Sequence, residues 1–520
     1  MRALNVFLAL GVSLLLALCV LELGLRLIGM APPRTINRFD PVLGWSKKPD
    51  ATTRRSTREY DVTLAINALG LRDDPMTDPA RPENTFRVLC LGDSFTLGYV
   101  VAREDLFVDQ LEGWWKSENR RVDVVNAGSE GYSTDQEVVW LRQHGDEFQP
   151  DLVLLFPYDN DIYWNVRREY FGKPKPRFRA DGTLEERELA DPGERGWFGR
   201  TALGNLLGSV RAGGGGAQEW FVPDDGEKRI LKEFGVLLAT LPAFITDAVT
   251  RTGGALAALK AKCDQLGARL VVAPIPSHSA IDPEFAERFG KRRGLAPDTW
   301  SPQQPFEIFL RLCRENGIET LDCREHLRAR AADHALYFQA DWHLNPDGNR
   351  AFAEFLLAEL GERLQVFPAA HSAISPGAFP APADAGRVRT WPKVFALLWV
   401  LLTALYWGTY RDEKPWQPPL KVFLMLAAIF AIVLGGGWLI GTLPPIVAQA
   451  AAIVFVVALL GFIAYKLGRR VGTILELFKS FTLRGHWYLM PLVVVLLSIG
   501  SLLVVAASSP LVAPFIYTLF

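Results

Sequence analysis

Short hydrophobic segments alternate with amphipathic segments from Phe86 to about residue 360 of the chain. The hydrophobic segments predict strands buried on both faces, and the amphipathic segments between them predict surface helices. The strands are expected at residues 87–91, 122–126, 151–156, 269–274 and 319–321, and the helices at residues 104–116, 134–145, 255–265, 305–315 and 346–360. This alternation is typical of an α/β fold with a parallel sheet covered by helices on both faces.

Two segments depart from the alternation. Residues 165–250 contain many charges, several prolines and a glycine run at 213–216, so we interpret them as an insertion that forms either a lid or an ordinary surface loop. Residues 366–392 contain five prolines and little hydrophobic periodicity, which predicts a linker. The soluble domain is therefore expected to span residues 30–365.

The two ends of the chain carry long uncharged segments. Residues 3–21 hold no charge over nineteen positions, close to the ~20 needed to cross a bilayer, and no small-x-small cleavage site follows. We therefore predict an uncleaved anchor within residues 1–29. Three further uncharged segments, at 394–410, 422–465 and 485–520, predict four transmembrane helices in residues 393–520, because Pro444 and Pro445 divide the longest one.

The charge distribution supports this division and indicates an orientation. Residues 394–520 hold eight Lys or Arg and three Asp or Glu, a charge of +5, while the rest of the 520 residues carries −6. The basic loops 411–421 and 466–484 are predicted to face the cytoplasm, which places residues 30–390 on the other side of the membrane. Strong nucleic-acid binding and disorder are excluded by the balanced charge and the hydrophobic content.

Five cysteines are too few and too scattered for a disulfide scaffold or a zinc module. Whether Cys313 and Cys323 pair with each other is left open by the sequence.

The first predicted strand ends in Leu-Gly-Asp-Ser-Phe-Thr-Leu-Gly, residues 91–98. The glycine spacing matches neither phosphate-binding motif. Ser94 instead follows the carboxyl end of the strand, where parallel sheets bind ligands. If a helix begins there, its free N–H groups can stabilise a negative oxygen.

Two more loops follow the second and third strands. Residues 126–133 contain Gly128 and Gly131, which allow a close backbone approach or simply form a turn. In residues 157–161, Asn160 can donate its amide to a developing oxyanion. Asp159 and Asp161 are alternative metal ligands, but no His or Glu cluster accompanies them, so we expect no metal.

Asp341 precedes His343 by two positions, just ahead of the last helix. A carboxylate in that place can hold an imidazole in the tautomer that a serine nucleophile requires. The alternative is a solvent-exposed His near a helix end.

These four loops together resemble the SGNH (GDSL-like) hydrolase family over about residues 60–365, and residues 66–73 look like membrane-anchored bacterial members. The resemblance implies a three-layer, flavodoxin-like parallel sheet without a cofactor. It also implies that Ser94 is the nucleophile, His343 the general base and Asp341 its orienting acid. Ser94, Gly131 and Asn160 would form the oxyanion hole. The expected location is then the bacterial inner membrane, with a multi-pass chain and a periplasmic catalytic domain.

Two positions depart from the family pattern. Pro157 or Tyr158 stands where the third motif has Gly, and the acid lies two rather than three residues before His343. The shorter spacing is similar to that in alginate O-acetylation proteins. We therefore keep three hypotheses: an esterase that removes O-acyl groups, with O-acetyl expected, from a carbohydrate; a polysaccharide O-acetyltransferase; and a non-catalytic membrane component of polysaccharide assembly.

The last residues, from 487 to 520, resemble a short uncharacterised bacterial membrane family linked with exopolysaccharide gene sets. This resemblance implies a context and no reaction. The expected partners are an acylated carbohydrate, the lipid bilayer and membrane proteins of polysaccharide biosynthesis, and no nucleic acid. For the site itself, we predict a His343 nitrogen about 2.6–3.2 Å from the Ser94 oxygen, with Trp342 directed away from that contact.

Overall fold

The computed structural model describes residues 35–363, apart from 58, 77, 119, 194–195, 205–218 and 224–228, together with residues 18, 22 and 26 and scattered positions between 395 and 427. The chain divides into two compact units. One combines Pro33–Glu194 with Gly215–Arg387, and the other combines Met1–Pro32, Arg195–Gly214 and Val388–Phe520. The sheet and the candidate site belong to the first unit.

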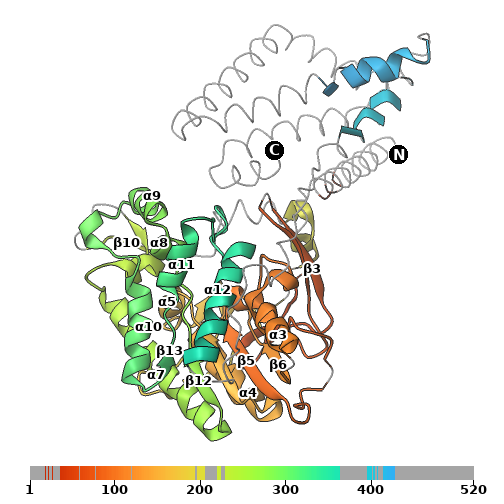
Figure 1. The fold of residues 1–520 in the computed structure, drawn as a ribbon. Helices are drawn as coiled ribbons and strands as arrows, with labels where there is room; N and C mark the ends of the chain where they lie inside the picture. Colours follow the sequence, from red (N-terminus) through yellow and green to blue (C-terminus); the bar gives the residue numbers. More distant parts are fainter. Residues whose placement is uncertain are drawn as a thin grey trace, which may run out of the picture. The chain divides into compact units, whose positions relative to one another are not determined.

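The centre of this unit is a sheet of five parallel strands (Figure 1). The strands are β5 Phe86–Gly92, β6 Val122–Asn126, β7 Leu152–Phe156, β12 Arg269–Val272 and β13 Glu319–Thr320. Their spatial order is β13-β12-β7-β5-β6. Read from β6 and numbered along the chain, it is 2-1-3-4-5, which is the flavodoxin-like order. The predicted parallel α/β sheet is confirmed, with each strand in its expected place.

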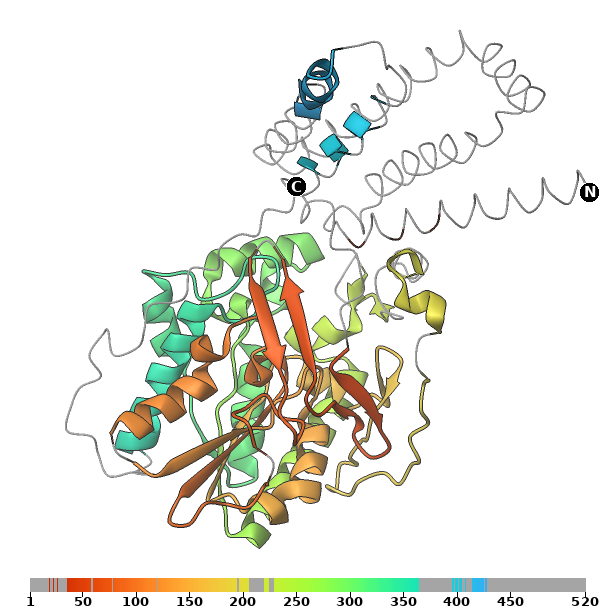
Figure 2. The same ribbon diagram turned by 90° about the vertical axis from the view of Figure 1, so that its right-hand side faces the viewer.

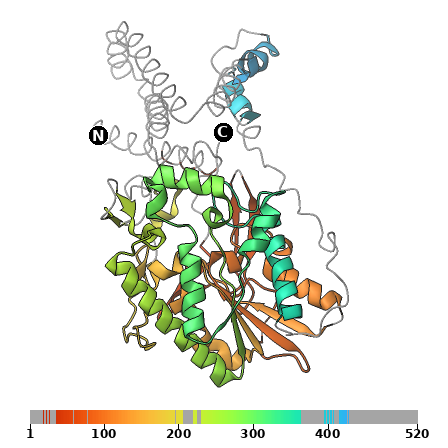
Figure 3. The same cartoon turned by 60° about the vertical axis from the view of Figure 1, so that its left-hand side comes forward.

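The hydrophobic core lies on both faces of the sheet. Leu152, Leu154 and Phe156 of β7 belong to one buried cluster. Val153 and Leu155, which point the other way, belong to a second. Successive side chains of a strand face opposite sides, so a wholly hydrophobic strand fills two cores. Figure 3 shows helices on both sides of the sheet, the three layers that were expected.

Five helices form the outer layers. The first cluster is covered by α3 Phe107–Ser117 and α12 Pro346–Ala358. The second is covered by α4 Thr134–Phe148, α7 Ala243–Leu266 and α10 Gln304–Glu315. The other described helices are α2 Ser94–Leu97, α5 Asp161–Trp164, α8 His278–Ile281, α9 Pro283–Arg293 and α11 Arg324–Ala331, with single turns η1 Arg103–Asp105, η2 Trp197–Arg200, η4 Pro297–Thr299 and η5 Glu359–Arg363.

The helix α7 corrects one predicted boundary. It begins at Ala243, twelve residues before the expected start, so the last part of residues 165–250 is helix rather than irregular insertion. In the structure, a Cβ at Gly254 would lie 2.5 Å from the backbone oxygen of Arg179, so glycine is required by close packing inside a continuous helix.

Two antiparallel hairpins upstream of the sheet were not predicted. They are β1 Asn37–Asp40 with β2 Gly44–Lys47, and β3 Thr52–Ser56 with β4 Asp61–Ala65. Figure 2 shows the β3–β4 hairpin in orange-red. Its strand β3 reads Thr-Thr-Arg-Arg-Ser and has no hydrophobic alternation, so the sequence pattern concealed it. Val62 and Leu64 of β4 nevertheless reach the core cluster that α3 covers.

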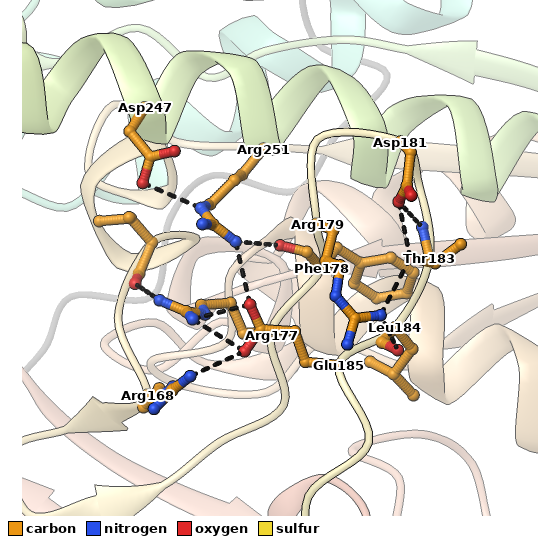
Figure 4. A network of polar contacts seen from close by, with 11 residues as sticks. Arg168, Arg177, Phe178, Arg179, Asp181, Thr183, Leu184, Glu185, Asp247 and Arg251 are labelled. Carbon is orange, nitrogen blue, oxygen red and sulfur yellow. Dashed lines mark hydrogen bonds and ion pairs between the residues drawn. The ribbon is translucent and has the colours of Figure 1, made fainter.

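The described parts of the insertion are anchored to the domain. They contain β8 Glu169–Tyr170, β9 Lys173–Pro174, β10 Trp220–Phe221, β11 Ile230–Leu231 and the turn η3 Lys232–Leu237. Glu185 accepts hydrogen bonds from Arg168 and Arg177, and from Arg251 of α7 (Figure 4). These contacts tie the first half of the insertion to a helix of the second core. Its action as a lid stays a prediction.

The predicted anchor and the four C-terminal helices lie almost entirely outside the described residues. Among the residues that the structure does describe, no helix combines the length and hydrophobicity that crossing a bilayer requires. The 366–392 linker also lies outside them. Cys313 and Cys323 are described, and both are free and buried.

Candidate active site

Ser94 is placed by a sharp connection between β5 and α2. The strand ends at Gly92, and the side chain of Asp93 accepts a hydrogen bond from the backbone N–H of Phe95 at 2.8 Å, which caps the helix. Ser94 is therefore the first residue of a helix that starts at the carboxyl end of β5. This is the position that the sequence predicted.

The hydroxyl of Ser94 contacts His343 across 249 positions of the chain. The distance from Ser94 Oγ to His343 Nε2 is 2.8 Å, within the predicted range. The other ring nitrogen, Nδ1, contacts Oδ1 of Asp341. With Nδ1 donating to the carboxylate, Nε2 is free to accept the serine proton.

The Asp341 carboxylate is held on both of its oxygens. Its Oδ2 accepts a hydrogen bond from the hydroxyl of Tyr60 at 2.7 Å, while Oδ1 faces His343. Burial raises the pKa of Asp341, but the contacts with His343 and Tyr60 outweigh burial and lower it below its usual value. The ionised form, which orients the imidazole, is therefore favoured.

The two-residue spacing between Asp341 and His343 requires an unusual backbone at Trp342. Its φ is +67°, in the left-handed region that costs a large side chain about 1–3 kcal/mol. The Trp342 ring packs against Phe285 and Phe289, with centroids 5.9 Å away in each case. It points away from the Ser94–His343 contact, as predicted.

Aromatic rings support the His343 ring. Phe95 lies 4.4 Å from it between centroids, and Tyr158 lies 4.5 Å from Phe95 on the other side. Tyr158 is one of the two residues where the family pattern has Gly. The departure from that pattern therefore adds a ring to a stack that ends on His343.

The predicted oxyanion donors occupy the two loops next to Ser94. Strands β6 and β7 pair with β5 on either side, so Gly131 and Asn160 follow the neighbours of the strand that carries Ser94. Gly131 has a φ of +74°, and a Cβ there would lie 2.5 Å from the Tyr170 ring. Glycine at 131 thus satisfies both a left-handed backbone and a close approach.

Asn160 has a partner that the sequence did not suggest. Burial raises the pKa of Glu233, from the turn η3, whereas hydrogen bonds from Trp164 and from the Asn160 side chain lower it. An amide nitrogen carries two hydrogens. A contact with Glu233 therefore leaves the second hydrogen of the Asn160 amide for another acceptor.

Buried acids lie around the same loops. Burial raises the pKa of Asp93 to about 6 and those of Glu137 and Asp161 well above their usual range. Asp135 forms a fully buried ion pair with Lys175 at 2.9 Å. Burial thus favours protonated carboxyls near the nucleophile.

In the described part of the chain, no three His, Cys, Asp or Glu side chains are grouped as metal ligands.

Residues 90–351 match the family model described as GDSL-like lipase/acylhydrolase. This match spans half of the chain. The chain belongs to that family. It is therefore an enzyme that hydrolyses ester bonds, and the hypothesis of a non-catalytic component is wrong for this domain.

Three solved structures are similar to this GDSL-like hydrolase at low sequence identity. TesA is 12% identical, covering 53% of this chain and 97% of its own, with a TM-score of 0.29. The esterase EstA from Pseudoalteromonas sp. is 13% identical, covering 54% and 98%, with a TM-score of 0.28. The acetyl xylan esterase AlAXEase is 13% identical, covering 53% and 100%, with a TM-score of 0.30.

Residues 471–520 match a second family, whose function is unknown. They lie outside the described residues, and the expected link to exopolysaccharide stays a prediction. No curated protein matches the chain.

The GDSL-like domain also uses residues that sequence reasoning missed, among them Tyr60 and Glu233. Neither belongs to a recognisable motif, and no signal in the sequence pointed to them.

Proposed function

We propose that this domain hydrolyses O-acyl esters through a triad of Ser94, His343 and Asp341. The observation that carries the proposal is the 2.8 Å contact between Ser94 Oγ and His343 Nε2, with Asp341 on the opposite ring nitrogen. His343 takes the proton of Ser94 as Oγ attacks the ester carbonyl carbon. It then returns that proton to the departing alcohol, and a water molecule, activated in the same way, releases the acid.

The negative oxygen formed in the attack would be held by three donors. These are the backbone N–H groups of Ser94 and Gly131 and the side-chain amide of Asn160. Support comes from the sheet, because β6, β5 and β7 are adjacent and their loops meet at one edge. The N-terminus of α2 adds its free N–H groups and the positive end of its dipole.

An acylated carbohydrate, with O-acetyl the expected ester, is the proposed substrate. Beside Glu233, the partner of Asn160, lies a cavity of about 190 Å³. Its lining combines aromatic faces with charged groups: Tyr163, Trp164, Arg167, Glu169, Phe171, Gly172, Glu219, Leu231 and Glu233. Such a mixture suits a ring with hydroxyl groups.

Phe171 tests this assignment. It is 46% exposed at the rim of the cavity. Phe171→Ala should raise KM for an acetylated oligosaccharide and leave hydrolysis of p-nitrophenyl acetate unchanged. Trp197→Ala, which removes an exposed ring outside the lining, is the matched control. Equal KM values for wild type and Phe171→Ala on the oligosaccharide would contradict the carbohydrate assignment.

The triad is tested by Ser94→Ala with p-nitrophenyl acetate as the reporter. Hydrolysis and labelling by a fluorophosphonate should both disappear, while circular dichroism stays that of the wild type. Ser117→Ala, an exposed serine at the end of α3, should keep both activities. Wild-type turnover in Ser94→Ala would remove the nucleophile assignment. Product analysis with an oligosaccharide acceptor then separates hydrolysis, which yields free acid, from acyl transfer.

We also propose that the domain is anchored on the outer side of a bacterial inner membrane. The support is the uncharged N-terminal run and the basic loops of the tail. In membranes from an expressing cell, the full chain should resist extraction at alkaline pH. Protease added to spheroplasts should cleave within residues 30–390. Extraction at alkaline pH, or protection of these residues, would contradict the arrangement.

A further inference from the structure

We propose that the turn of the β3–β4 hairpin belongs to the catalytic machinery, with Tyr60 and Glu59 as positioning residues for Asp341. The inference rests on the proposed triad. The hairpin precedes residue 90, where the match to the family model begins, so it supplies a support that the family's own motifs do not contain.

Tyr60 fixes the side chain of Asp341. Its hydroxyl donates to Oδ2 at 2.7 Å across 281 positions, and only 4% of Tyr60 is exposed. Burial raises the pKa of Tyr60 above its usual value, so the hydroxyl stays a neutral donor. Arg55 in turn donates to the Tyr60 oxygen at 3.3 Å. A chain of contacts therefore runs from Arg55 through Tyr60, Asp341 and His343 to Ser94.

Glu59 fixes the backbone ahead of Asp341. Its carboxylate accepts hydrogen bonds from three successive N–H groups, those of Gln339, Ala340 and Asp341, at 2.7, 3.0 and 3.2 Å. A single side chain thus holds the loop where it enters the site. Together, Glu59 and Tyr60 bind both the backbone and the side chain of Asp341.

The loop that carries Asp341 and His343 needs such support because its backbone conformation is unfavourable by itself. Asp341 and His343 face each other only if Trp342 keeps its left-handed backbone, with φ at +67°. Packing against Phe285 and Phe289 restrains Trp342 from one side. The hairpin restrains the preceding residues from the other. If it is removed, the carboxylate is free to rotate away from His343.

Tyr60→Phe and Glu59→Gln test the inference. Each should lower kcat by about 10- to 100-fold, as loss of an outer hydrogen-bond partner does at other sites, with KM nearly unchanged. Tyr60→Phe should also move the acidic limb of the pH–rate profile to higher pH. The Tyr60 hydrogen bond lowers the pKa of Asp341, so without it the carboxylate protonates sooner as pH falls.

Asp61→Asn is the matched control. It breaks the ion pair with Arg54 in the same hairpin but touches no part of the Asp341 loop. If Asp61→Asn slows the enzyme as much as Tyr60→Phe does, the hairpin acts only through stability and the inference is wrong.

The proposed role of the hairpin and the proposed triad can be disproved independently of each other. An active Ser94→Ala would overturn the triad itself. An inactive Ser94→Ala, combined with wild-type kcat and pH profile in Tyr60→Phe, would overturn the role of the hairpin alone. Should Tyr60→Phe unfold, the same kcat measurement on folded Glu59→Gln decides the question, with loss supporting the role and wild-type kcat overturning it.

Discussion

The nucleophile side and the acid–base side of the site are built by different kinds of structure. Ser94, Gly131 and Asn160 follow three adjacent strands whose inner residues are fully buried. His343 and Asp341 instead lie in a loop ahead of α12, outside any strand or helix. Their side chains remain about one-fifth exposed.

This difference shows where the precision of each half comes from. The carboxyl ends of parallel strands meet at one edge, so the sheet that forms the core also brings together the loops of the nucleophile side. The acid–base loop has no such scaffold. Its geometry depends on a few specific contacts from Tyr60, Glu59 and the ring of Trp342. The nucleophile side should therefore lose its geometry only when the whole domain unfolds. The acid–base loop should lose its geometry by local opening.

Removal of the base should have the largest effect. We expect His343→Ala to lower kcat on p-nitrophenyl acetate by on the order of 10⁴-fold or more. The thermal unfolding temperature should stay near that of wild type, because the side chain is partly exposed. His144→Ala, at a half-exposed histidine of α4, should keep full activity. A His343→Ala enzyme with wild-type kcat would show that the two halves do not act together.

Loss of a donor on the nucleophile side should cost less. We expect Asn160→Ala to lower kcat by about 10²–10³-fold, the usual cost of one oxyanion donor. Fluorophosphonate labelling should slow, with the serine still reactive. Asn316→Ala, which removes an amide at the end of α10, should leave kcat unchanged. An unchanged kcat in Asn160→Ala would take this residue out of the oxyanion hole.

The same contrast explains what the sequence could predict. The five strands follow from hydrophobic segments, and the first three are followed by loops that contain Gly, Ser or Asn. Local sequence contains that information. Asp341 and His343 were identified because they are neighbours in sequence. Tyr60 and Glu59 were not, because their contacts reach about 280 positions along the chain, from a turn that follows a strand with no hydrophobic pattern. The same is true of Glu233, which lies inside the irregular insertion.

The predicted start of α7 was wrong for a related reason. Glycine lowers helix propensity, so the local sequence around residues 253–254 does not favour a helix. In the structure, Gly254 is required because the backbone of Arg179, from the insertion, approaches it closely. This is a tertiary contact, which local sequence patterns do not contain.

A denaturant titration should separate the two halves in one protein. As urea is added, activity should decline at a lower concentration than the far-UV circular dichroism, because the loop opens locally while the sheet persists. Tyr60→Phe should widen the gap between the two midpoints, and Asp61→Asn should not. Coincident midpoints in wild type and in Tyr60→Phe would mean that the loop unfolds only with the core.

The smallest expected effect concerns pH, and here the two halves should have opposite signs. On the nucleophile side, Asp73 accepts the N–H of Asn126 at the end of β6, and burial raises its pKa to about 7. A carboxyl whose pKa is raised on folding contributes stability that is fully present below its unfolded value, near pH 4, and is lost as pH rises through 7. Asp341, with a lowered pKa, contributes stability above its unfolded value that is lost as pH falls.

Asp73→Asn should therefore flatten the decline in the free energy of unfolding between pH 5 and 7, by up to about 1.4 kcal/mol per pH unit for one proton. Asp341→Asn should leave that decline in place. The measurement is urea unfolding followed by circular dichroism at a series of pH values. If Asp73→Asn and wild type show parallel curves, Asp73 is not the carboxyl that titrates on the nucleophile side. Asp93, with a pKa raised by burial to about 6, would then be the next residue to replace.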